Sequence, residues 1–355
     1  QVDKSPAAVA LYLAGLHAGT VHVPLNPAFT PAEVAFFVED AEPALVVDPA
    51  TLDRLLERAE ALDAAPVTPR ADTDLAALLY TSGTTGRPKG AALTHANLRH
   101  NARALQEIWR FSGDDHLLHT LPLFHVHGLF VALHCAMLAG IPVTFLRRFD
   151  VDAVLDGLRD ATVVMGVPTH YARLLADDRF DRAATASVRL FTCGSAPLTP
   201  AGSEAVTHRT GHRICERYGM SEAGIITSNP VDGERIAGTV GFPLPGVELR
   251  VVDGDGRPVG VDQPGSVEIR GPHLFTGYWR RPEATAAAFR PDGFFVTGDV
   301  GSLDAAGRLT LQGRAGDMVI SGGENVYPKE IELVLDAVEG VVESAVIGLP
   351  HPCLL

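Results

Sequence analysis

The spacing of apolar and polar residues predicts helices and short strands in the first part of the chain. Ser5 precedes a run of apolar residues at helical spacing and is predicted to cap a helix. Thr30 and Glu33 have the spacing of a capping box, which predicts the start of a second helix. The apolar residues 44–48 predict a short strand. Residues 61–74, rich in Ala, Pro and Asp, predict a loop or linker.

From residue 75, short apolar runs alternate with segments of helical periodicity. This alternation predicts a doubly wound α/β sheet, in which ligands bind beside the loops that follow the strands. The longest apolar stretch, 130–146, is short for a membrane span and predicts a buried helix followed by a strand. Strands are predicted over 75–80, 161–168, 188–195 and 212–219, and helices over 94–109 and 169–177.

Beyond Gly238 the pattern changes to short alternating runs separated by Gly-Asp and Asp-Gly turns. Such runs predict a small antiparallel barrel or sheet. A new unit is predicted after Arg314, with a helix that begins near Pro328 and a strand over 342–350. The antiparallel strands are predicted within 238–260, 265–271 and 307–314.

Composition limits the classes that this chain can belong to. A length of 355 residues suggests two or three domains, and a net charge of −14 argues against nucleic-acid binding. The four cysteines lack C-x-x-C spacing, so we expect reduced thiols and a cytoplasmic protein. The chain starts without methionine and ends in HPCLL, so we expect a piece of a longer protein.

The stretch YTSGTTGRPKG, residues 80–90, has the composition of a phosphate-binding loop. Its glycines free the backbone N–H groups to turn inward, while its hydroxyls and its lysine add donors and a cation. It is not a Walker A loop, because Lys89 follows proline and precedes glycine. A surface turn is the alternative, but the position between a buried strand and a capped helix favours phosphate. The candidate phosphate ligands are Ser82, Gly83, Thr84, Thr85, Gly86 and Lys89.

This loop resembles the signature loop of the adenylate-forming superfamily, which contains acyl-CoA synthetases, luciferases and the adenylation domains of peptide synthetases. Five further motifs resemble the family in the family's order. They are RYGMSEAG (217–224), GYWRRPEATAAAF (277–289), DGFFVTGDVG (292–301), GRAGD (313–317) and SGGENVYPKEIE (321–332). The resemblance implies that a carboxylate attacks the α-phosphate of ATP, pyrophosphate leaves, and the acyl group passes to CoA.

The resemblance also implies a domain organisation within an α/β fold. Residues 1–314 would form the large N-terminal domain, with doubly wound α/β subdomains over 1–237 and a small β-barrel over 238–314. Residues 315–317 would be the hinge, and 318–355 the beginning of a truncated, mobile α+β C-terminal domain. Relatives carry a catalytic lysine late in that domain. None of this chain's three lysines fits that role, so we expect it to be absent. In relatives the segment with Ser321, Gly322 and Gly323 lines the CoA passage.

The resemblance assigns roles around the nucleotide. Glu222 and Thr81 would hold Mg²⁺, which needs few protein oxygens, and Ser221 would touch the α-phosphate. Taken alone, Glu222 would be read as a solvated surface acid, and only its motif favours the metal ligand. Asp299 would bind the ribose with Arg314 beside it, although a turn aspartate is the alternative reading. Tyr218 would stack on adenine, whose edge would meet the turn formed by Gly194, Ser195, Ala196 and Pro197.

The segment LPLFHVHGLF, residues 121–130, contains a His-x-His pair. A metal site would need further ligands, and none stands at sensible spacing, while a pair of core histidines remains open from composition alone. The resemblance places this segment along the acyl pocket. It implies that His125 lies near the reacting carboxylate and that His127 belongs to the substrate pocket.

The sequence around Arg217 resembles that of malonyl-CoA synthetases within the superfamily. An arginine beside the adenine-stacking tyrosine can pair with a second carboxylate. We therefore expect malonate as the acid, with methylmalonate left open, and Met220 as a further substrate contact. The alternative is that Arg217 pairs with Glu216 or Asp232 and that the acid is monocarboxylic.

Two other classes of protein remain open from the sequence. One is a non-catalytic module that binds a nucleotide or acyl-adenylate, and the other is a peptide-synthetase adenylation domain. The expected partners are the small molecules ATP, CoA and a malonate-like acid, with no nucleic acid and no membrane. The expected assembly is a monomer or a weak homodimer.

Overall fold

The structure is a computed structural model whose described residues cover most of the chain. The described ranges are 1–81, 87–317, 319–321, 324–326, 328–336, 338, 340–341 and 343–348.

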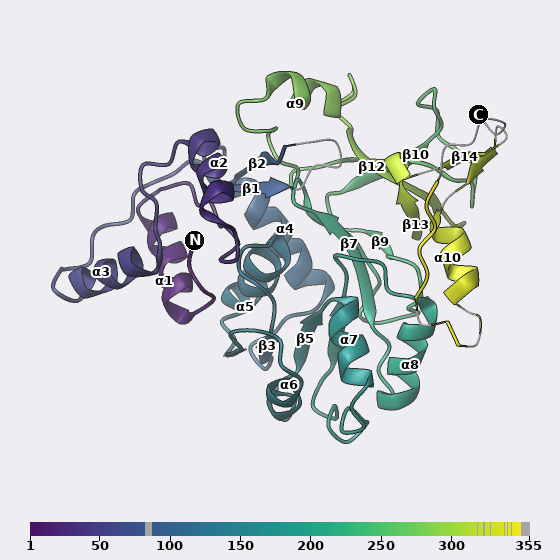
Figure 1. Cartoon of the computed structure of the whole chain (residues 1–355), viewed down its shortest axis with the longest axis horizontal. Helices are drawn as coiled ribbons and strands as arrows, with labels where there is room; N and C mark the ends of the chain where they lie inside the picture. The colour runs from purple at the N-terminus through teal and green to yellow at the C-terminus, as the bar shows by residue number, and fades with distance from the viewer. Residues whose placement is uncertain are drawn as a thin grey trace.

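Three helices form the first part of the molecule and lie together at one end (Figure 1). The Ser5 hydroxyl accepts the Ala8 N–H at 3.1 Å, and Thr30 and Glu33 form both bonds of the capping box, so both predicted helix starts are confirmed. The strand predicted over 44–48 is wrong, because these residues pair with no strand among the described residues. The helices are α1 (Pro6–His17), α2 (Pro31–Ala41) and α3 (Pro49–Glu60).

A seven-stranded sheet forms the centre of the molecule. Strand order is β4-β3-β5-β6-β7-β8-β9; neighbours from β4 to β7 run parallel, and β8 and β9 are antiparallel additions. The predicted strands at 161–168, 188–195 and 212–219 are confirmed within it. The strands are β3 (Leu117–His119), β4 (Val143–Phe145), β5 (Val163–Gly166), β6 (Leu190–Cys193), β7 (Cys215–Met220), β8 (Gly224–Ser228) and β9 (Phe242–Pro243).

Both faces of this sheet are covered by helices, as the doubly wound pattern predicts. Successive residues of a strand point to opposite faces. Leu117 accordingly packs into one core with α4 and α5, whereas Leu118 packs into another with α6, α7 and α8. The helices are α4 (His95–Ile108), α5 (His134–Ala139), α6 (Val151–Gly157), α7 (Pro168–Leu175) and α8 (Pro200–Thr210).

A two-stranded antiparallel ladder brackets the predicted phosphate loop. Strand β1 (Leu75–Thr81) was expected, whereas β2 (Lys89–Thr94) was not, and it lies between the loop and the helix capped by Thr94. Thr81 pairs with Lys89 at the end of this ladder next to the loop. The loop residues Ser82, Gly83, Thr84, Thr85 and Gly86 lie outside the described residues.

The β-rich part is a four-stranded antiparallel sheet, which confirms the pattern read beyond Gly238. Its inner side chains share one apolar core with β1, β2 and Tyr218, so this sheet packs against the α/β part. Helix α9 (Pro282–Ala288) lies next to β12, an inner strand of this sheet. The strands are β10 (Glu248–Val252), β11 (Gly265–Arg270), β12 (Phe295–Leu303) and β13 (Leu309–Arg314).

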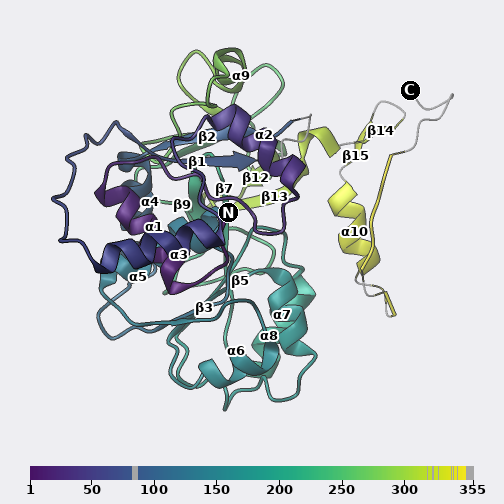
Figure 2. The same cartoon turned by 60° about the vertical axis from the view of Figure 1, so that its left-hand side comes forward.

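The last described elements lie at one side of the molecule (Figure 2). Residues 315–317 form a 3₁₀ turn, and the helix predicted near Pro328 is confirmed as α10 (Pro328–Asp336). The strand predicted over 342–350 is wrong for residues 343–348, which form no strand. A short hairpin, β14 (Val319–Ser321) and β15 (Glu324–Val326), precedes α10. Within the described ranges, none of the helices is long and apolar enough to cross a membrane.

Candidate functional site

A π-helical turn opens the apolar segment that follows β3. The expected buried helix is present, but its first part, His127–Leu133, is wound as a π-helix and continues directly into α5. Such turns carry an extra residue per turn and occur often at functional sites. The turn places the His127 ring in the interior, while His125 stays exposed beside the Phe124 ring.

Arg217 lies in the interior on β7 and has no carboxylate partner in the part of the chain that the structure describes. Its side chain is 3% exposed. One Nη donates a long bond of 3.4 Å to the Ser195 hydroxyl, and Nε has no partner. Burial lowers the pKa of Arg217 to about 10, which leaves the guanidinium charged near neutral pH.

The two protein acids that could have paired with Arg217 are engaged elsewhere. Glu216 accepts the Gly238 N–H at 3.0 Å. Because it directly precedes Arg217 on β7, its side chain points to the face of the strand opposite to Arg217. Asp232 forms an ion pair with Arg110. The internal salt bridge considered as the alternative from sequence is therefore not formed.

His127 and Ser195 complete a cluster of polar groups around Arg217. His127 Nδ1 lies 3.4 Å from the Ser195 hydroxyl, and its Nε2 is buried with no partner among the described residues. Burial, reinforced by the charge of Arg217, holds the pKa of His127 well below its usual range, so the ring is neutral. Among the described residues, no three His, Cys, Asp or Glu side chains gather as a metal site.

The Ser195 hydroxyl points toward Arg217 and His127, and the contact of its turn with adenine stays a prediction. The turn after β6 holds Ser195 at φ +70°, a left-handed conformation that is uncommon outside glycine. A Cβ at Gly194 would lie 2.6 Å from the Arg217 guanidinium, so the turn and the arginine are tightly packed. The sequence offers no signal for this contact, because it joins the ends of two strands.

Glu222 is a buried acid rather than the solvated one that was the alternative. It is 6% exposed and accepts the Tyr278 hydroxyl at 3.0 Å. Burial raises the pKa of Glu222. Lys89 Nζ lies 4.6 Å from the centre of the Tyr278 ring, so the predicted phosphate-binding lysine and the predicted metal ligand share a neighbour. Tyr278 falls in a family-like motif, yet the sequence analysis did not single it out.

Thr81 lies at the rim of the predicted phosphate site. Its hydroxyl donates a long bond of 3.4 Å to the Lys89 carbonyl, across the first pair of the β1–β2 ladder. Ser221 follows β7 and directly precedes Glu222, and Met220 is the last residue of β7. Met220 and Ser221 therefore lie between Arg217 and Glu222 along the chain.

Tyr218, Asp299 and Arg314 form a second hydrogen-bonded group, at the junction of the α/β part and the antiparallel sheet. The Tyr218 hydroxyl donates to Asp299, and Arg314 Nε lies 2.9 Å from the other Asp299 oxygen. Asp299 is 7% exposed and belongs to β12, so it is not the turn residue considered as the alternative. Burial raises the pKa of Asp299, and Arg314 opposes that shift.

The predicted CoA passage is described only in part. Ser321 ends β14, whereas Gly322 and Gly323 lie outside the described residues.

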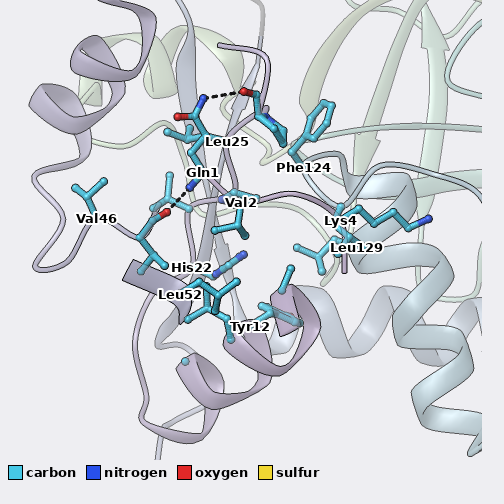
Figure 3. A pocket seen from close by; sticks show the side chains of 18 of the residues that line it. Gln1, Val2, Lys4, Tyr12, His22, Leu25, Val46, Leu52, Phe124 and Leu129 are labelled. Atoms are coloured by element: carbon cyan, nitrogen blue, oxygen red, sulfur yellow. Dashed lines mark hydrogen bonds between the residues drawn. The ribbon is translucent and has the colours of Figure 1, made fainter. Parts of the chain in front are cut away.

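A separate cavity of about 1680 Å³ lies between α1, α2, α3 and the segment after β3 (Figure 3). Its wall is mainly apolar and includes Tyr12, Leu52 and Phe124. Leu129, on the π-helical turn, also lines it.

The layered sheet, the attached antiparallel sheet and the buried groups between them define an α/β protein with the N-terminal architecture of adenylate-forming enzymes. The solved structures that share it include a MatB and a malonyl-CoA ligase. The ATP-bound crystal structure of MatB from Rhodopseudomonas palustris matches with a TM-score of 0.94 and 47% identity, covering 99% of this chain and 75% of that one. A malonyl-CoA ligase in a ternary product complex with methylmalonyl-CoA and AMP matches at 0.79 and 39%, covering 99% and 80%.

The sequence profile of the AMP-binding enzyme family matches residues 1–279, and the chain belongs to this family. The malonate–CoA ligase of Arabidopsis thaliana is 40% identical over 297 residues, which are 78% of this chain and 48% of the relative. A feruloyl-CoA synthase of an Amycolatopsis species is 36% identical over 365 residues, 98% and 74% of the two chains. The chain spans about half the length of the plant ligases that it matches. The expected fold and superfamily are confirmed.

Proposed function

We propose that the protein is an ATP-dependent carboxylate–CoA ligase that acts on malonate. In the first step one malonate carboxylate attacks the α-phosphate of ATP, which forms the acyl-adenylate and releases pyrophosphate. In the second step the CoA thiol attacks the acyl carbon and AMP leaves. The names of the similar ligases and the family membership support the reaction class.

The observation that carries the choice of malonate is the buried Arg217 without a carboxylate partner among the described residues. Keeping an isolated charge in the interior is unfavourable unless another charge pairs with it. The second carboxylate of a dicarboxylic acid would supply that charge and could bind the guanidinium through two hydrogen bonds. Ser195 and neutral His127 offer further donors to the same carboxylate.

The remaining groups fit the activated end of the acid and the nucleotide. His125 would lie beside the reacting carboxylate, with Met220 as a further contact of the acid. Asp299 would accept the ribose hydroxyls, with its carboxylate held by Arg314, and Tyr218 would border the adenine. The phosphates would meet Ser221, Lys89 and the loop Ser82–Gly86, because glycine-rich loops turn backbone N–H groups toward anions.

Glu222 and Thr81 fit a magnesium ion. Glu222 is buried, carries a raised pKa and forms no ion pair within the described ranges, and a cation beside it would favour its charged form. Both residues offer the oxygen ligands that Mg²⁺ prefers. When bound, the ion would neutralise charge on the triphosphate, and the chain's own part is to orient the reacting groups.

The proposal includes a large N-terminal domain over 1–314, a hinge over 315–317 and the beginning of a C-terminal domain over 318–355. The hinge at 315–317 would let the elements after it move between the two steps, and the segment with Ser321 would then border the CoA passage. Cys135, Cys193 and Cys215 are buried free thiols, which agrees with a reducing cytoplasm.

The test is a pyrophosphate-release assay of the full-length protein with a panel of acids. The panel contains malonate, methylmalonate, propionate and ferulate, each with and without CoA, and mass spectrometry identifies the thioester. We expect malonate to give the highest kcat/KM and to yield malonyl-CoA. A preference for propionate or ferulate would reject malonate while keeping the ligase class. An absence of pyrophosphate release with every acid would favour the non-catalytic module.

A further inference from the structure

His119, at the end of β3, is joined directly to the π-helical turn. Its Nε2 lies 2.9 Å from the Gly128 carbonyl oxygen. Because a carbonyl only accepts, Nε2 must carry the proton. Burial lowers the pKa of His119 to about 3, so the neutral ring keeps this bond across the physiological range. The ring is 1% exposed, and Nδ1 has no hydrogen-bond partner in the described part of the chain.

The same turn is fixed from a second side by a close backbone approach. A Cβ at Gly128 would lie 2.0 Å from the Pro122 carbonyl oxygen, a distance at which the two segments must separate. Only glycine permits this approach. Gly128 directly follows His127, so both contacts act on the backbone next to the His127 ring.

His119 is itself supported from the N-terminal segment. Lys4 Nζ donates to the His119 carbonyl at 2.8 Å and lies 4.5 Å from the centre of the Phe145 ring. The His119 ring packs on the same Phe145 ring, with the centroids 5.1 Å apart. In Figure 3 the Lys4 side chain points away from Val46 and Leu52 on the cavity wall. The imidazole is therefore held in one orientation by its neighbours.

We propose that His119 is a positioning residue that determines which acids the site accepts. Through Gly128 it fixes His127 relative to Arg217, and this spacing limits the size of the acid that can reach both the arginine and the nucleotide. The proposal rests on the proposed function, because it assigns a role in the same acid pocket. His119 itself contacts neither the acid nor the nucleotide.

The size of the effect follows from the geometry of a short acid. Malonate has only one methylene between its carboxylates. It is therefore too short to change its conformation and reach a group that a displaced turn has moved. A misplacement of about 1 Å near a reacting group can cost on the order of 100-fold in rate. Succinate is longer by one methylene and would tolerate the displacement better than malonate. A loosened turn should therefore reduce the preference for malonate over succinate.

The test compares two substitutions of His119 by residues with a side-chain amide. The amide nitrogen takes the place of the ring Nε2 in one variant and of the ring Nδ1 in the other. In His119→Gln the side-chain amide reaches the place of Nε2 and can still donate to Gly128. In His119→Asn the amide reaches only the place of Nδ1, so the bond is lost. Steady-state kinetics of the full-length protein are measured with malonate and succinate at saturating ATP, and with varied ATP at saturating malonate.

We expect His119→Asn to raise the KM for malonate roughly tenfold and to lower the malonate-to-succinate ratio of kcat/KM by a similar factor. The KM for ATP should stay within about twofold of the wild-type value. His119→Gln should restore both acid parameters to within about threefold. Gly128→Ala, which displaces the turn while keeping the His119 side chain, should repeat the pattern of His119→Asn.

Several results would overturn the inference. Equal KM changes for malonate and ATP in His119→Asn would indicate a general structural role, as would failure of the glutamine variant to restore selectivity. If His119→Asn does not fold, as judged by thermal unfolding, Gly128→Ala decides, and an unchanged acid selectivity in that variant rejects the proposal. If the wild-type protein does not prefer malonate, the proposed function is rejected instead. This result comes from the wild-type protein alone, so it is distinguishable from a failure of the inference about His119.

Discussion

At the scale of single residues, the acid site depends on groups whose charge is set by burial. Arg217 stays charged and unpaired among the described residues, and His127 stays neutral beside it. The family-like motifs identified Arg217 and His127 in the sequence. They did not identify Ser195 as their neighbour, because that contact depends on how strands β6 and β7 lie side by side.

Asp299 provides a residue-scale prediction for the nucleotide site. Asp299→Asn removes the charge that pairs with Arg314 and, in the proposed site, accepts the ribose hydroxyls. Because hydrogen bonds to a charged group contribute about 1.5–3 kcal/mol, we expect kcat/KM for ATP to fall about 10- to 150-fold. The KM for malonate at saturating ATP should change little. A matched control is Asp304→Asn, at a turn beyond the same strand. Equal losses for both substrates would contradict the assignment.

Glu216 provides a prediction about pH. Burial raises the pKa of Glu216 to about 7, against an ordinary value of 4.5. The folded state then binds the proton more tightly than the unfolded state does. The stability linked to this group is therefore fully present below pH 4.5 and is lost as pH rises through 7. By linkage the loss amounts to about 3 kcal/mol at most.

Glu216→Gln keeps an acceptor for the Gly238 N–H but cannot ionise. We expect urea unfolding to show that this variant gains stability over the wild type between pH 5 and pH 8, by up to about 3 kcal/mol. A difference between the two proteins that is the same at both pH values would contradict the pKa shift.

At the scale of elements, helix caps and alternating strands were predictable because their signals are local. The capping box at Thr30 and the cap at Thr94 are both formed. The π-helical turn was not predictable, because its apolar residues would suit an α-helix equally well. The apolar residues 44–48 looked like a strand. These residues pair with no strand among the described residues. Leu45 is instead 58% exposed and lines the large cavity.

The cap of α4 gives an element-scale prediction. The Thr94 hydroxyl accepts the Asn97 N–H at 3.2 Å, at the point where β2 turns into α4. Thr94→Ala should lower the free energy of unfolding by about 1 kcal/mol, or somewhat more because the site is buried. Thermal or urea unfolding measures the change. Thr68→Ala, in an exposed loop, is the control and should change stability by less than about 0.5 kcal/mol.

At the scale of the whole molecule, the two groups of buried polar residues lie where different parts of the fold meet. Arg217 and Tyr218 are neighbours on β7, and successive side chains of a strand point to opposite faces. One therefore reaches the acid site, and the other reaches Asp299 on the antiparallel sheet. The alternating pattern predicted the parts of the fold, but their packing against one another became visible only in three dimensions.

The most direct measurement is malonate-dependent pyrophosphate release by Arg217→Ala, with Arg159→Ala as the control. Arg159 is an exposed arginine in the turn after α6, and its ion-pair partner in the described structure is Asp156. The account predicts that Arg217→Ala loses at least about 30-fold in kcat/KM for malonate, because a buried charge pair is broken, while its KM for ATP is preserved. Arg159→Ala should match the wild type. Undiminished malonate turnover by folded Arg217→Ala would contradict the account.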